Sequence, residues 1–190
     1  MMDNKIRCRW CGSDELYQTY HDLEWGNPEH RDEALFELLI LEGFQAGLSW
    51  ITILKRREAF REAFAQFDYH ALANWSNEQL EAQMQNELII RNRLKISAVR
   101  TNAQAFIKIQ EKFGSFNQYI WEFVGHEPIL NHFAQHGELP ASTEISVLLS
   151  KSLKKNGFRF VGPTICYALM QAAGLVNDHT IDCFRHPNNS

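Results

Sequence analysis

Residues 148–174, LLSKSLKKNGFRFVGPTICYALMQAAG, contain two helix-like segments that flank a short turn. Gly157 suits the residue that follows a helix C-terminus, because glycine adopts left-handed backbone conformations without a Cβ penalty. Pro163 suits the first position of the next helix, since its φ is already helical and an N–H there would have no helical partner. The stretch therefore predicts a tight hairpin of two helices, over about 146–174.

The start of the second helix in this hairpin is a candidate phosphate-binding site. Backbone N–H groups at a helix N-terminus are free to bind an anion. Gly157 and Gly162 form the rim of the turn, and Lys154, Lys155 and Arg159 stand beside it. The alternative interpretation is an ordinary turn between two helices that binds nothing. This segment alone leaves both interpretations open.

The rest of the chain shows the same helical pattern, because apolar residues recur at spacings of three and four with almost no strand-like alternation. The segment 125–143, with two prolines and two glycines, is expected to be an irregular excursion. The fold class is therefore predicted to be all-α. Helices are expected over about 14–24, 32–44, 49–65, 77–85, 93–113, 115–124, 146–156 and 163–173.

Length and composition favour one domain in a reducing compartment. At 190 residues with 45% hydrophobic content, the chain can form a single well-packed domain over 1–190. The opening MMDNKIRCRW lacks the apolar run of a signal peptide, and no segment approaches the roughly 20 apolar residues of a membrane span. We therefore expect a cytoplasmic protein without membrane contact, in which cysteines bind metal or pack in the core rather than form disulfides.

The net charge of −4 provides no general attraction to nucleic acid, so contacts with DNA would have to come from local basic clusters. One cluster is the lysine pair beside the hairpin turn. Another, in IRNRLK, contains Arg91, Arg93 and Lys95. The alternative interpretation, which holds for most clusters of this kind, is a solvated helix face.

The segment VNDHTIDCFRHP places His179 and Cys183 one helical turn apart, so that both can point at one metal ion. Side chains that could complete the site are Cys8, Cys11, His21 and, less plausibly, His186. The spacing Cys8-x-x-Cys11 is common in zinc sites and is narrowly favoured, and Cys8 with His21 is the rival set. A third interpretation is that the thiols are simply buried. Either four-ligand set is closed, which is typical of structural rather than catalytic zinc.

Glu42 lies on the wrong face of its predicted helix. In DEALFELLILEGF, Leu35, Leu38 and Leu39 form an apolar stripe, and Glu42 falls within it. A charge directed at the core is costly without a partner, so this carboxylate is a candidate site residue. The alternative is that the helix unwinds at Gly43 and leaves the carboxylate exposed.

Aromatic residues with polar tips surround this carboxylate in the sequence. Trp50 follows the glycine-containing segment GFQAGLS, and Tyr17, Tyr20 and Trp25 come from LYQTYHDLEWG. Each of them alone is most simply a core residue. Together with a misplaced carboxylate, they indicate a pocket for a flat, polar and cationic ring.

Four segments of the chain match a known family. YHDLEWG, LEGFQAGLSWITILKRRE, LSKSLKKNGFRFVG and QAAGLVNDH resemble the bacterial 3-methyladenine DNA glycosylase I family, and the likeness runs nearly end to end. The resemblance implies an all-α helix-hairpin-helix glycosylase fold, with the hairpin at about 146–174. It implies a monomer that flips 3-methyladenine out of alkylated double-stranded DNA and excises it by hydrolysing the N-glycosidic bond, which leaves an abasic site.

The resemblance also assigns residues, and it replaces the narrow preference for Cys11. It implies one structural zinc ion that joins segments 1–25 and 175–190 through Cys8, His21, His179 and Cys183. The implied base-binding residues are Glu42, Trp50, Tyr20, Tyr17 and Trp25, with Glu42 as the catalytic residue. The implied DNA-binding residues are Gly47 and Leu48 as a wedge in the gap left by the flipped base, and Gly157, Gly162, Lys154 and Lys155 at the hairpin.

Two features depart from the family pattern or leave its mechanism open. Phe44 stands where a polar residue is expected, and His186 adds an imidazole near the metal ligands. No residue is assigned to activate water, because the nearest aspartate to the hairpin, Asp178, adjoins a zinc ligand. The competing interpretations are a zinc-stabilised, non-catalytic helix-hairpin-helix DNA-binding module and a metal-dependent hydrolase, which a closed zinc site disfavours.

Overall fold

The computed structural model describes residues 5–189, so the outermost residues of the expected zinc-linked segments, 1–4 and 190, lie outside the described residues. Most of the described chain is helical, which confirms the all-α prediction. The helices are α1 (Glu15–Leu23), α2 (Asp32–Gln45), α3 (Trp50–Leu54), α4 (Arg57–Ala63), α5 (Tyr69–Ala73), α6 (Asn77–Gln83), α7 (Arg93–Phe113), α8 (Phe116–Trp121), α9 (Glu144–Lys155) and α10 (Pro163–Ala172). Two very short strands are β1 (Ile129–Leu130) and β2 (Val176–Asn177), and 3-10 turns cover Arg9–Cys11, Ala65–Phe67, Glu122–Val124, His136–Glu138 and Pro187–Asn189.

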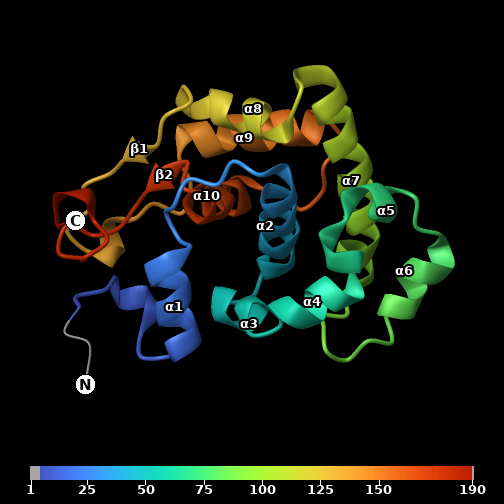
Figure 1. Cartoon of the computed structure of the whole chain (residues 1–190), viewed down its shortest axis with the longest axis horizontal. Helices are drawn as coiled ribbons and strands as arrows, with labels where there is room; N and C mark the ends of the chain where they lie inside the picture. Colours follow the sequence, from blue (N-terminus) through green and yellow to red (C-terminus); the bar gives the residue numbers. More distant parts are fainter. Residues whose placement is uncertain (1–4, 190) are drawn as a thin grey trace.

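Helix α2 lies at the centre of the molecule, between α10 and α7 (Figure 1). Its residues Leu35, Phe36, Leu39 and Leu41 are fully buried although they point in different directions around the helix. A helix that is apolar on nearly every side is stable only inside a core. The expected single stripe therefore underestimates how much of α2 is covered.

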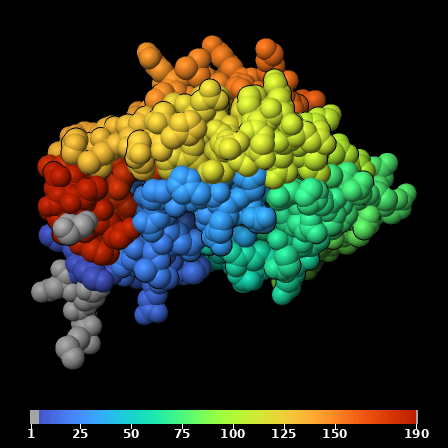
Figure 2. Space-filling model, turned by 45° about the horizontal axis from the view of Figure 1, so that its top comes forward, coloured from blue at the N-terminus to red at the C-terminus, as the bar shows by residue number. Residues whose placement is uncertain are grey.

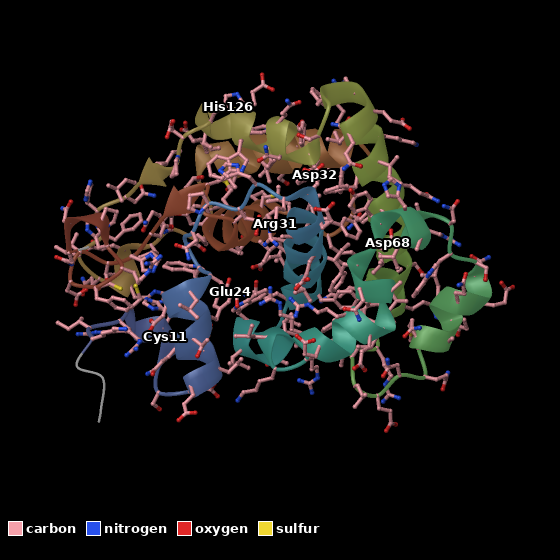
Figure 3. All side chains as sticks on the ribbon, in the orientation of Figure 1. Cys11, Glu24, Arg31, Asp32, Asp68 and His126 are labelled. Carbon is pink, nitrogen blue, oxygen red and sulfur yellow. The ribbon has the colours of Figure 1, made fainter. Side chains whose placement is uncertain are left out.

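The N-terminus of α2 is fixed by Asp32, which points towards α8 (Figure 3). Its carboxylate accepts hydrogen bonds from the backbone N–H groups of Phe116 and Asn117, at 2.9 and 2.8 Å, and from Gln110 Nε2 at 2.6 Å. Phe116 and Asn117 begin α8, and their N–H groups have no acceptor within that helix. The Asp32 carboxylate satisfies them, and its negative charge is favourable at a helix N-terminus. One side chain thus ties together α2, α7 and α8.

The prediction of one continuous helix over 49–65 is wrong, because the chain forms two helices, α3 and α4, with a break at Arg56 (φ −109°, ψ 5°). The backbone then takes positive φ values at Ala65, Gln66 and Phe67 and changes direction. This turn brings α5, which the sequence did not predict, against α7, where Tyr69 packs on Phe106 with 4.8 Å between ring centroids. Tertiary packing overrides the continuous helical pattern here.

The hairpin of α9 and α10 forms as predicted. Helix α9 ends at a C-cap on Asn156, Gly157 follows with φ +95°, and α10 begins at Pro163. The turn between them is anchored from inside, since the backbone carbonyl of Val161 accepts a 2.6 Å hydrogen bond from Ser150 Oγ. This hydrogen bond fixes the end of the turn to α9.

The two ends of the described chain lie side by side, with the C-terminal residues packed beside the N-terminal ones (Figure 2). Phe184 N donates to Ile6 O at 2.8 Å, which is a direct backbone link between them. Close by, β1 and β2 pair in parallel, with Ile129 opposite Val176, and join the irregular excursion to the chain after α10. Within residues 5–189, no helix has both the length and the apolar character needed to span a membrane.

Candidate functional site

Glu42 lies one turn before the end of α2 and is 2% exposed. Helix α2 continues to Gln45, so the alternative in which the helix unwinds at Gly43 is wrong. Within the described residues, Glu42 Oε2 is buried and has no hydrogen-bond partner. Burial raises the pKa of Glu42 well above its usual range, because desolvation disfavours the charged form. Oε2 of this carboxyl group can therefore accept a hydrogen bond from a ligand, because no described residue around it supplies a donor.

A cavity of about 270 Å³ opens beside Glu42 and brings together the aromatic residues that the sequence singled out. The aromatic residues come from α1, the segment after it and the start of α3, while Glu42 comes from α2. The lining is Trp10, Tyr17, Tyr20, Trp25, Glu42, Gln45, Trp50, His136, Leu139, Ala168 and Gln171. Among the described residues of this lining, Glu42 is the one with a carboxyl group.

The aromatic rings form a packed wall around the cavity. Tyr20 and Trp50 lie with ring centroids 5.4 Å apart, and Trp10 lies 4.8 Å from Tyr17 and 4.9 Å from Trp25. Burial raises the pKa of Tyr17 to about 12 and that of Tyr20 well above its usual value. Both phenols therefore remain protonated at neutral pH and can donate hydrogen bonds.

Three polar atoms around this cavity are buried with no hydrogen-bond partner among the described residues: Glu42 Oε2, Trp10 Nε1 and Trp50 Nε1. Native proteins rarely leave buried polar groups unpaired, and each exception calls for an explanation. A flat ligand with polar edges would satisfy them. The cavity is thus suited to an aromatic base, and a positively charged one would also relieve the buried carboxylate.

Sequence reasoning missed several lining residues for identifiable reasons. Trp10 belongs to the 3-10 turn after Cys8, and no periodic pattern marks it as a pocket residue. His136 and Leu139 come from the irregular excursion, whose path cannot be inferred from periodicity. Ala168 and Gln171 face the cavity from α10, so the second helix of the hairpin also forms part of the pocket.

Asp178 is a structural hub. It is 1% exposed, and its carboxylate accepts hydrogen bonds from Tyr167 Oη, from Gln171 Nε2 at 2.8 Å and from Asn131 Nδ2 at 2.7 Å. It thereby joins α10 to the segments that flank β1 and β2. Its carboxylate oxygens are occupied by these three donors, and Asp178 is not among the residues that line the cavity. It is therefore poorly placed to activate water there.

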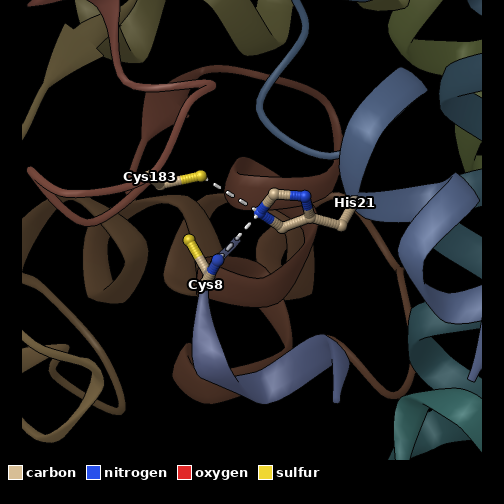
Figure 4. Close-up of side chains that lie close together, drawn as sticks. All are labelled: Cys8, His21 and Cys183. Carbon is tan, nitrogen blue, oxygen red and sulfur yellow. Dashed lines mark hydrogen bonds between the residues drawn. The ribbon is translucent and has the colours of Figure 1, made fainter. Parts of the chain in front are cut away.

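A second cluster lies between the two ends of the chain. The ligand atoms of Cys8, His21 and Cys183 all lie within 4.8 Å of one another, and all three side chains are buried (Figure 4). His21 Nε2 is 3.4 Å from Cys183 Sγ. On the other side of the ring, His21 Nδ1 lies 2.8 Å from Asp22 Oδ1, which directs Nε2 at the thiols. These residues form a group that could hold a metal ion.

His179, the remaining expected ligand, stands next to this group. Its ring centroid is 4.9 Å from that of His21, and its Nδ1 is 3.1 Å from Asn177 Oδ1. Its Nε2 is buried without a hydrogen-bond partner in the described part of the chain. Cys11 lies outside the group, since its thiol donates to Cys8 O at 3.1 Å, so the early preference for Cys11 as a ligand does not fit the structure. Two thiols and two imidazoles, one with an unpaired nitrogen, fit the donor set of a closed zinc site.

The expected DNA-binding residues lie on open surface. Gly47 has φ +82° and an added Cβ there would meet nothing within 4 Å, and the neighbouring Leu48 is 41% exposed. A Cβ at Gly162 would also point into open space, and Lys154 and Lys155 are exposed at the end of α9. Phe44, which departs from the expected pattern, is buried against Phe60 with 4.7 Å between centroids. Its side chain belongs to the core rather than to the surface loop.

Comparisons with known proteins agree over almost the whole chain. A family described as methyladenine glycosylase matches residues 10–186. The chain is 49% identical over 183 residues to DNA-3-methyladenine glycosylase 1 of Escherichia coli, covering 96% of this chain and 98% of that protein. A crystal structure of 3-methyladenine DNA glycosylase I superposes with a TM-score of 0.94 at 49% identity, covering 96% of this chain and 100% of the other. A structure of the Staphylococcus aureus enzyme, described as showing the basis of 3-methyladenine recognition, gives a TM-score of 0.92 at 36% identity, with 95% and 96% covered.

Proposed function

The chain belongs to the methyladenine glycosylase family, and we propose that its aromatic cavity is the place where the excised base is held. It is a DNA-repair glycosylase that excises 3-methyladenine from alkylated DNA by hydrolysing the N-glycosidic bond. The observation that carries the proposal is Glu42, a buried carboxyl group without a partner in a cavity of about 270 Å³ lined by aromatic rings.

The cavity can distinguish the methylated base by charge. Methylation at N3 makes the base cationic while it is still attached to the sugar. We propose that Trp50 stacks on the ring, that Glu42 accepts hydrogen bonds from its donor edge and balances its charge, and that Tyr20 fixes its orientation. Tyr17 and Trp25 complete the wall. Normal adenine is neutral and gains less from the buried carboxylate.

The chemistry requires little acid catalysis. A base must leave the duplex stack before its bond to the sugar can be cleaved, and a damaged base unstacks more readily. A cationic base is already a good leaving group, so capture, orientation and placement of water can provide most of the rate. Glu42, as the one carboxyl group in the lining, is the proposed catalytic residue, and in its ionised form it can also polarise the water.

The proposed DNA contacts explain how a chain with a net charge of −4 binds double-stranded DNA. The helix-hairpin-helix of α9 and α10 offers backbone N–H groups at the start of α10, with Lys154 and Lys155 beside them. Gly47 and Leu48, at the exposed loop after α2, would fill the gap left by the flipped base. We propose that one copy of the chain makes all of these DNA contacts, so that the protein acts as a monomer.

We propose that the metal site binds one structural zinc ion through Cys8, His21, Cys183 and His179. Zinc would fasten the start of the chain to its end without taking part in hydrolysis. His21 directly follows Tyr20 on α1, so the same helix carries a metal ligand and a wall of the base cavity. The fastening would thereby keep Tyr20 in position.

Release of bases from methylated duplex DNA tests the function and the pocket together. The wild-type chain is expected to release 3-methyladenine. Glu42→Gln should reduce the single-turnover rate on the order of 100-fold, because it removes one partner of a buried charged contact. Trp50→Ala should reduce it roughly 10-fold through lost stacking.

The matched control for this experiment is Glu33→Gln, an exposed glutamate on the same helix, which should leave the rate unchanged. Rates near the wild-type value in both pocket variants would exclude this cavity as the base site. Absence of any released base from the wild-type chain would instead favour the alternative, a zinc-stabilised DNA-binding module without catalysis.

A further inference from the structure

Lys95 is a buried lysine that holds the end of the helix carrying Glu42. It lies in the first turn of α7 and is 7% exposed, so the solvated-face interpretation of such clusters does not apply to it. Its Nζ donates hydrogen bonds to Phe44 O at 2.9 Å and to Ala46 O at 2.6 Å. Both acceptors are backbone carbonyls at the C-terminus of α2.

These carbonyls would otherwise lack partners. The last carbonyl groups of a helix have no hydrogen-bond donor within the helix, and a cation near them is also favoured by the helix dipole. The intervening carbonyl, that of Gln45, accepts a hydrogen bond from Leu48 N at 2.6 Å. Lys95 and this turn together fix the direction in which the chain leaves α2 towards the exposed Gly47 and Leu48.

Asn102 holds the hairpin turn in the same manner. It is 3% exposed, its Oδ1 accepts a hydrogen bond from Arg159 N at 2.8 Å, and its Nδ2 donates to Arg159 O at 3.1 Å. A side-chain amide that pairs with both backbone groups of one residue fixes the position and the orientation of that residue. Arg159 lies in the middle of the turn between α9 and α10.

Lys95 and Asn102 lie on one face of the same helix, two turns apart, which is about 10 Å along the axis. The hairpin turn also lies close to the last turn of α2, because a Cβ added at Gly43 would be 3.5 Å from Phe160 Cβ. Helix α7 runs beside α2 (Figure 1). One rigid helix therefore sets the separation between the loop after α2 and the hairpin turn.

We infer that Lys95 and Asn102 are positioning residues that hold the loop 46–49 and the turn 156–162 at the spacing at which both engage one DNA duplex. The inference rests on the proposed function, in which the loop enters the helix stack and the turn binds the backbone. Neither residue belongs to the lining of the base cavity. Loss of either should affect steps that involve the duplex and leave binding of the base itself intact.

The test compares a duplex with a substrate that needs no base flipping. Lys95→Met keeps the length of the side chain and removes its hydrogen-bond donors. It should lower single-turnover excision of 3-methyladenine from duplex DNA roughly 10- to 100-fold, the range expected for lost hydrogen bonds to a charged group. Excision from a methylated single strand, and quenching of tryptophan fluorescence by free 3-methyladenine, should stay within about twofold of wild type. Asn102→Leu should chiefly weaken binding to the duplex.

Lys108→Met, an exposed lysine on α7, is the matched control and should match wild type in every measurement. Lys95→Gln keeps a neutral NH2 donor group and serves if Lys95→Met fails to fold, with a smaller loss expected on the duplex alone. Equal losses on duplex, single strand and free base would show that Lys95 only supports the fold, and unchanged duplex rates would also overturn the inference. If the wild-type chain released no base, the proposed function would fail, while duplex binding by the Asn102 variant would still test the positioning role.

Discussion

At the scale of single residues, Glu42 shows how one side chain can be unfavourable for folding and suited to a ligand. It lies on a helix that is buried on nearly every side, and within the described residues Oε2 has no partner. The cost of burying it is reflected in its raised pKa, whose cause is desolvation. A cationic base in the cavity would reverse this cost by supplying the missing opposite charge.

The raised pKa of Glu42 predicts a pH-dependent effect of Glu42→Gln on stability. Between the ordinary carboxyl pKa of 4.5 and the raised value, the folded chain holds a proton that the unfolded chain has released. The contribution of this group to the free energy of unfolding therefore falls as pH rises through that range. Glutamine is neutral at every pH, so the variant should gain stability relative to wild type as pH rises above the ordinary carboxyl pKa towards the raised one. Chemical denaturation at several pH values measures the difference in free energy of unfolding between variant and wild type. For the control Glu33→Gln, this difference should not change with pH.

Sequence reasoning succeeded or failed at each site residue according to its local context. Glu42 could be predicted because a charge within an apolar helical stripe is visible in the sequence. Lys95 could not, since it follows Arg91 and Arg93 in a run that looks like a solvated surface, and only the position of α2 shows what it binds. Trp10 could not be predicted either, because it reaches the cavity from a 3-10 turn.

At the scale of secondary-structure elements, the hairpin could be predicted whereas the break between α3 and α4 could not. The backbone preferences of glycine and proline are local, so Gly157 marks the end of α9 and Pro163 marks the start of α10 without reference to the rest of the fold. The break after α3 is not marked by either residue. It depends on how the following segment packs α5 against α7, which is a property of the folded chain.

The hairpin leads to a prediction about salt. Replacing both Lys154 and Lys155 by glutamate should weaken duplex binding and reduce the slope of log affinity against log salt by about 2, because each lysine near a phosphate releases one counterion. Lys108→Glu with Lys112→Glu, an equal charge change on exposed positions of α7, should have a smaller effect. Binding titrations over a range of salt concentrations give both slopes. Unchanged affinity at low salt would contradict the placement of the hairpin on DNA.

At the scale of the whole molecule, the two ends of the chain meet at a buried cluster of thiols and imidazoles. The cluster joins α1, which provides part of the base cavity, to the segment after β2. Sequence patterns suggested the metal but left its ligands open between Cys11 and His21. The resemblance favoured His21, and the folded chain agrees with that choice, since it places His21 beside Cys183 and directs the thiol of Cys11 at a backbone carbonyl.

The proposed zinc site predicts a clear difference between two cysteine variants. Cys183→Ser should lose the bound zinc and lower the melting temperature, because a closed site contributes directly to folding. Cys11→Ser should retain one zinc per chain and most of the stability, since serine can still donate to Cys8 O. Metal analysis and thermal unfolding measure both. Equal zinc content in the two variants would exclude Cys183 as a ligand, and the preference for 3-methyladenine should not change in either.

Helix α10 begins at the hairpin turn and, two turns later, lines the base cavity with Ala168 and Gln171. One added or deleted residue within it would rotate these side chains by about 100° and shift them by about 1.5 Å. In the proposed function, the helix sets the distance between the phosphate at the turn and the base in the cavity, so its length should not tolerate change.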